Sequence, residues 1–86
     1  MNAPVKTITV KDILLSRDFL QGYRDAGYNF PFYEHYDRLS RPGQWLYERG
    51  RQFYFAAGPM RILHKDGVTD SAASAYKALR NNKTIV

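Results

Sequence analysis

The chain has 86 residues and carries 13 lysine and arginine side chains against 8 acidic ones, a net charge of +5. This length favours a single domain over residues 1–86, and a hydrophobic content of 44% is too high for a disordered tail. No apolar run approaches the ~20 residues that cross a bilayer, and the first ten residues lack the pattern of a secretory signal peptide. With no cysteine there is no disulfide or thiol chemistry. We therefore expect a cytoplasmic protein without a membrane partner.

The basic side chains are concentrated in the second part of the chain. Residues 1–37 carry four basic side chains against five acidic ones, whereas residues 38–86 carry nine against three. Eight of the cations are arginine, whose planar guanidinium group suits phosphates and stacked bases. A positively charged second half favours binding to a phosphate-bearing or acidic partner. The alternative is that the excess positive charge only keeps the protein soluble.

The first part of the chain predicts an extended start followed by a helix. The segment 5–10 alternates apolar and polar side chains and is rich in β-branched residues, so residues 1–9 are predicted to form a short strand or an N-terminal arm. Thr9 is a candidate N-cap, because Asp12 then falls in the first helical turn. The spacing of apolar residues predicts one helix over 10–27, ended by Gly27. Its expected inner face holds Leu15, Phe19, Gly22, Tyr23 and Ala26.

An aromatic loop is expected over residues 28–41. Six aromatic side chains, counting His35, lie within the nine residues 28–36, around Pro31. So many rings are costly to leave in water, and we expect most of them to fold down as a lid on the core.

Two further helices are predicted in the second half. The first runs over 42–57, with Ser40 as its N-cap and Pro42 in its first turn. The second runs over 69–81 and begins at Thr69 or Asp70. Residues 60–64 fit either a strand or a helical turn, and the tail 83–86 can add a short strand. The predicted fold class is mostly α, a small three-helix domain built on a helical hairpin. Whether a short terminal strand is added is not decided by the sequence.

Groups for catalysis are sparse. His35 and His64 lie in different segments without metal-ligand spacing, so we expect no metal site. Glu34 and Asp37 lie beside His35 and are able to do acid–base chemistry, but many polar loops contain three such residues. The sequence contains neither of the two glycine-rich phosphate-binding motifs, GxxxxGK(S/T) and GxGxxG. The prediction is a non-enzymatic protein without a cofactor.

One pattern stands above the background, an arginine-rich helix beside the aromatic loop. Guanidinium groups for phosphates and flat rings for unstacked bases are the mixture that many RNA-binding proteins use. The same pattern also has a structural interpretation, in which the rings form the core and the arginines lie on a solvated helix face. The candidate binding residues are Arg38, Arg41, Arg49, Arg51, Tyr33, Tyr36 and Trp45.

Three segments, taken in order, resemble the ribosome modulation factor family. They are GYRDAG at 22–27, PFY at 31–33 and RPGQWLYERGR at 41–51. The resemblance covers about residues 19–55. It departs from the family pattern at Phe30, where the family has cysteine before the proline, and at Arg51, where a late tryptophan is missing.

The resemblance implies two helices in close contact at Gly22 and Gly50. It also implies a small, basic, α-helical protein that binds the small ribosomal subunit near the 3′ end of its RNA, blocks initiation and promotes ribosome dimers in resting cells. The partner would then be the ribosome or its RNA, with the candidate arginines along phosphates and Tyr33, Tyr36 or Trp45 against bases.

Two other functions stay open. A protein-interaction module, such as a phage- or prophage-type inhibitor that docks on a single host protein, would use the same tyrosine, tryptophan and arginine side chains. A DNA-binding domain would place helix 69–81 in the major groove, but that helix offers few groups that read base edges. A homodimer is compatible with the sequence and is not required by it.

Overall fold

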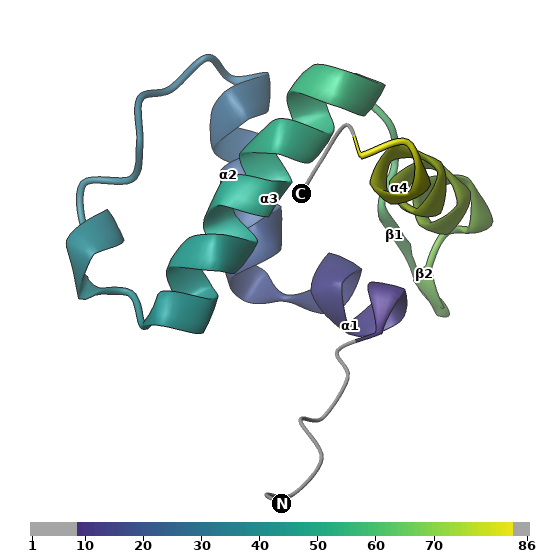
Figure 1. Cartoon of the computed structure of the whole chain (residues 1–86), viewed down its shortest axis with the longest axis horizontal. Helices are drawn as coiled ribbons and strands as arrows, with labels where there is room; N and C mark the ends of the chain where they lie inside the picture. Colours follow the sequence, from purple (N-terminus) through teal and green to yellow (C-terminus); the bar gives the residue numbers. More distant parts are fainter. Residues whose placement is uncertain (1–8, 84–86) are drawn as a thin grey trace, which may run out of the picture.

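Hydroxyl side chains determine where the helices begin. The computed structural model describes residues 9–83, and in it Thr9, Ser16, Ser40 and Thr69 each accept a backbone N–H bond from three residues further on. Thr9, Ser40 and Thr69 are the caps that the sequence predicts. The elements are α1 (Val10–Leu15), α2 (Arg17–Gly27), η1 (Tyr36–Arg38), α3 (Arg41–Ala57), β1 (Leu63–His64), β2 (Gly67–Val68) and α4 (Asp70–Asn81) (Figure 1). The mostly helical fold class is confirmed. The strand or arm predicted over residues 1–9 and the short strand predicted over 83–86 lie outside the described residues, apart from Thr9 and Lys83.

The single helix predicted over 10–27 is wrong, because the chain turns at Ser16. This residue has extended backbone angles (φ −64°, ψ 133°) and is at once the C-cap of α1 and the N-cap of α2. Its hydroxyl accepts the N–H of Phe19. The break changes which side of α1 faces inward, so that Ile13 and Leu14 are buried while Leu15, expected on the inner face, is 44% exposed.

Two glycines allow α2 and α3 to touch backbone to backbone. A Cβ atom built on Gly22 would overlap the carbonyl oxygen of Tyr47, and one built on Gly50 would overlap the carbonyl oxygen of Phe19. The close glycine-bearing helix pair that the sequence predicts is therefore confirmed.

The two helices run in the same direction. Near their starts, Asp18 lies beside Gly43, and near their ends Gly27 lies beside Tyr54. The connection 28–40 is long enough to return along the full length of α3, whereas a short connection would force an antiparallel pair (Figure 1). The aromatic loop consequently lies along one side of α3.

The core lies where α1, α2, α3 and α4 meet. The rings of Phe19, Phe53 and Tyr76 form a triangle with centroids 5.7 to 6.0 Å apart. Val10, Ile13, Leu14, Ile62 and Ala72 complete this buried cluster. The helix pair α2–α3 thus forms a scaffold, and α1 and α4 cover one side of it.

A small β-hairpin, with two residues in each strand, lies between α3 and α4 in the chain. Leu63 pairs with Val68 and His64 pairs with Gly67, which decides the open interpretation of this segment in favour of a strand. The turn is supported by the Nδ1 atom of His64, which accepts the N–H of Asp66. In the part of the chain described, none of the helices has the length and apolar character needed to span a membrane.

The glycine contact makes a prediction for stability. Gly22→Ala and Gly50→Ala should each lower the free energy of unfolding by about 1–3 kcal/mol, because the added methyl group meets backbone that cannot move without separating the helices. Urea unfolding followed by circular dichroism measures the change.

Gly27→Ala is the matched control. A Cβ atom at this position would lie 3.3 Å from the edge of the Tyr54 ring, a side chain that can shift. A loss as large as that of the other two variants would show that the close backbone contact is not what limits the helix pair.

Candidate RNA-binding and partner-binding surfaces

Polar bonds from α3 hold the aromatic loop in place. The hydroxyl of Tyr47, which is fully buried, accepts the backbone N–H of Tyr33 at 2.8 Å. The Gln44 side chain donates to the carbonyl oxygen of Tyr36 at 3.3 Å, and the Arg51 side chain donates to that of Phe30 at 3.1 Å. The loop is therefore positioned by its backbone, and its rings need not be buried to keep it ordered.

The bond network continues inward to a buried carboxylate. Tyr47 donates to Asp25, 2.6 Å away, and Gln21 donates to the other oxygen of that carboxylate at 2.8 Å. Gln21 accepts in turn from the guanidinium group of Arg24. Burial, followed by the hydrogen bond to Asp25, raises the pKa of Tyr47, so its hydroxyl keeps the proton that it donates. This network joins α2, α3 and the loop.

The candidate arginines do not form one surface. Residues two positions apart on an α-helix are separated by a rotation of about 200°. Accordingly, the Arg49 guanidinium lies 4.4 Å from the centre of the Trp45 ring, whereas that of Arg51 lies 4.8 Å from the centre of the Phe32 ring, in the loop. Helix α3 therefore presents two flanks with different chemistry.

The first flank is basic. Arg41, Trp45 and Arg49 follow one another at four-residue spacing along α3, and Trp45 is 39% exposed. Arg80 of α4 approaches this flank at Tyr76: burial raises the pKa of Tyr76, and the nearby positive charges of Arg49 and Arg80 both act to lower it. We call Arg41, Trp45, Arg49 and Arg80 the basic flank.

The second flank is aromatic and more exposed than predicted. The expected lid is wrong for Tyr28, Phe30 and Phe32, whose exposed fractions are 66%, 53% and 50%. Phe55 of α3 is 65% exposed and lies beside Arg51. Because the loop backbone is already bound by α3, these rings remain at the surface. We call Tyr23, Tyr28, Phe30, Phe32, Tyr54 and Phe55, with Arg24 and Arg51, the aromatic face.

Three other candidate residues lie apart from the basic flank. The Tyr33 ring packs against Tyr47 and His35. The Tyr36 hydroxyl donates to the carboxylate of Glu48, and this bond is the largest cause that raises the pKa of Tyr36 to about 12. Arg38 is exposed in η1. The structure therefore brings together Arg41, Trp45 and Arg49 from the predicted set, with Arg80 added.

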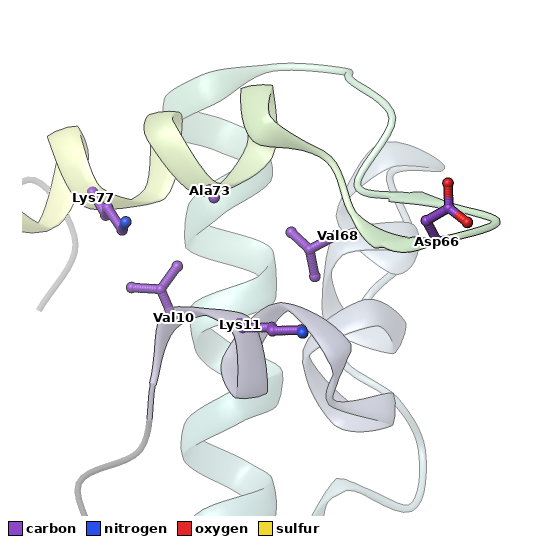
Figure 2. A pocket seen from close by; sticks show the side chains of 6 residues that line it. All are labelled: Val10, Lys11, Asp66, Val68, Ala73 and Lys77. Carbon is purple, nitrogen blue, oxygen red and sulfur yellow. The ribbon is translucent and has the colours of Figure 1, made fainter.

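A hollow between α1, the hairpin and α4 does not have the layout of a small-molecule site. Its volume is about 250 Å³, below the usual range of ligand pockets. Figure 2 shows Val10 and Val68 bordering the space, while Asp66 lies at the tip of the hairpin on the side away from Lys77. Asp66 and Lys77, at opposite ends of the hollow, do not converge on one ligand atom, and Lys11 lies between them.

Ionisable groups are also dispersed elsewhere. Within residues 9–83, no three histidine, aspartate or glutamate side chains come together as a metal site. His35 and Glu34, the loop pair noted in the sequence, lie 3.6 Å apart, and both are exposed. The same described range contains no arginine paired with a carboxylate.

Comparisons with known proteins leave the family open: no protein-family model, no curated protein and no solved structure matches this chain.

Tyr47→Phe should lower the free energy of unfolding by about 1–3 kcal/mol, because the buried Asp25 loses a donor and the Tyr33 amide loses its acceptor. Hydrogen exchange of the Tyr33 amide should accelerate at the same time. Tyr36→Phe, which removes a hydroxyl bonded to the half-buried Glu48, is the control. Equal exchange at Tyr33 in wild type and Tyr47→Phe would contradict this account of the loop.

Alkaline pH should destabilise the protein. The pKa values of Tyr23, Tyr36, Tyr47 and Tyr76 are raised above 10.0, chiefly by burial or, for Tyr36, by its bond to Glu48. Between pH 10 and about 12 the folded chain therefore binds more protons than the unfolded chain, so the free energy of unfolding falls as pH rises. Urea midpoints measured across this window, together with tyrosinate absorbance, test the sign. A midpoint that stays constant or rises would contradict it.

Proposed function

We propose that this chain is a small, non-catalytic, cytoplasmic regulator that binds ribosomal RNA on the ribosome and lowers translation, as its resemblance to the ribosome modulation factor family implies. The basic flank is the observation that carries this proposal. There, the guanidinium group of Arg49 stacks on the half-exposed Trp45, and Arg80 adds a second cation from another helix.

The cations of this flank are available to phosphates. Among residues 9–83 neither Arg49 nor Arg80 is paired with a carboxylate. Arg49 donates one bond to the side chain of Gln52, at 3.2 Å, and a guanidinium group has five N–H donors. These guanidinium groups can therefore bind phosphate oxygens in a bidentate manner without first breaking an internal ion pair.

The ring beside these cations supplies the second element of RNA recognition. Trp45 offers part of its indole surface to the solvent, and an unstacked base gains about 1–3 kcal/mol by stacking on such a ring. Single-stranded or looped RNA, whose bases are accessible, is accordingly the nucleic acid that suits this flank. Docking on a single protein, the second function left open by the sequence, relies on the aromatic face instead.

The proposal predicts a salt-dependent loss of binding. Arg49→Gln combined with Arg80→Gln should weaken binding to purified small ribosomal subunits at least tenfold at low salt. Salt should also weaken the binding of the variant less steeply: the negative slope of log K against log salt should become shallower by about 0.7 for each phosphate that the variant no longer neutralises. Co-sedimentation through sucrose over a range of salt concentrations gives both quantities.

Arg17→Gln is the matched control, because it removes the same type of charge at the start of α2. It should bind within about twofold of wild type, as expected for a cation that touches no phosphate. Wild-type binding by the double variant, or no binding of the unaltered chain to subunits, would refute the proposed function. Circular dichroism verifies that each variant is folded.

A further inference from the structure

The aromatic face contains a hollow of its own at the end of α2. Its volume is about 310 Å³, and it is lined by Tyr23, Arg24, Gly27, Tyr28, Tyr54 and Pro59. Three of these residues supply aromatic rings, and Gly27 supplies no side chain that would fill the space. The hollow is large enough for a bulky apolar side chain from a partner.

The hollow continues into the rest of the aromatic face. Tyr28 stacks on Phe30 with ring centres 5.4 Å apart, and Tyr54 meets Phe55 at 5.8 Å. The Arg51 guanidinium lies 4.8 Å from the ring centre of Phe32. Ring contacts therefore connect the hollow beside Arg24, through Tyr54 and Phe55, to Arg51. Tyrosine and arginine are among the residues that dominate binding energy at protein interfaces.

The charges of this face select an acidic partner. In the described part of the chain, neither Arg24 nor Arg51 has a carboxylate partner, so each offers a positive charge at the border of an apolar surface. A cationic segment would be repelled at both ends. The loop segment 28–33, which carries the exposed rings, has no lysine or arginine, so an RNA backbone would find no further cations along it, and the acidic residues Glu34 and Asp37 come after these rings.

We propose that the aromatic face binds an acidic segment of another protein. A bulky apolar side chain of that segment enters the hollow between Tyr28 and Tyr54, and flanking carboxylates meet Arg24 and Arg51. This interaction goes beyond RNA binding and uses none of the residues of the basic flank.

A peptide selection tests the inference. A random-peptide library displayed on phage, selected against the full chain, should yield peptides in which aspartate or glutamate flanks tryptophan, phenylalanine or leucine. A synthetic peptide of the consensus sequence should then shift the backbone amide resonances of Tyr28, Tyr54 and Phe55 in the isotope-labelled protein.

Substitutions of exposed rings distinguish specific docking from adhesion. Tyr28→Ser and Phe55→Ser replace rings that contribute little to the core, and each should weaken binding of the consensus peptide at least tenfold. Leu63→Ser, at an exposed apolar position in the hairpin outside the aromatic face, should leave it unchanged. Arg24→Glu combined with Arg51→Glu should reverse the selected preference towards lysine and arginine, with circular dichroism as the check on folding.

Four results would overturn the inference. The selection could enrich no peptides, or peptides without acidic residues, and Leu63→Ser could lose as much peptide binding as Tyr28→Ser. The fourth result is that poly(U) RNA displaces the peptide and that Tyr28→Ser also weakens binding of this RNA. The last result would assign the face to RNA. Arg49→Gln combined with Arg80→Gln should leave peptide binding intact, so failure of the ribosomal proposal and failure of this one are separable.

Discussion

The backbone contact between Gly22 and Gly50 controls the geometry of the whole molecule. A side chain at either position would collide with the carbonyl group of the facing helix, so only glycine permits this separation of α2 and α3. Since both helices run in the same direction, the connection between them must return along the length of α3. The placement of the aromatic loop on one flank of α3 is thus a consequence of the helix pair and its connection.

Polar bonds, more than apolar burial, then determine what that loop displays. Tyr47 is buried beneath it and binds its backbone through the Tyr33 N–H, while Arg51 and Gln44 bind two of its carbonyl groups. A loop ordered in this way does not need to bury its rings. Three of the five phenylalanines, Phe30, Phe32 and Phe55, are accordingly half-exposed or more, so they add little to the buried core.

Much of the fold could be predicted because its determinants are local. The caps at Thr9, Ser40 and Thr69 and the glycine contact follow from residue type and spacing. The break at Ser16 was missed because favourable helical residues surround it, although Asp18 two positions later is typical of a first turn. The exposure of Phe30 and the approach of Arg49 and Arg80 to Tyr76 depend on contacts between distant segments, which no periodicity reveals.

The division of α3 into two flanks also explains why net charge alone is a poor guide to function here. Arg49 and Arg51 are nearly adjacent in sequence, yet one stacks on Trp45 and the other lies over Phe32. Between the flanks lies Glu48, whose carboxylate accepts the bond from Tyr36 and places a negative charge between the two cations. A polyanion that follows the basic flank therefore meets repulsion before it reaches Arg51. Under the two proposals, RNA and an acidic protein segment would bind opposite sides of the same helix and would not compete with each other.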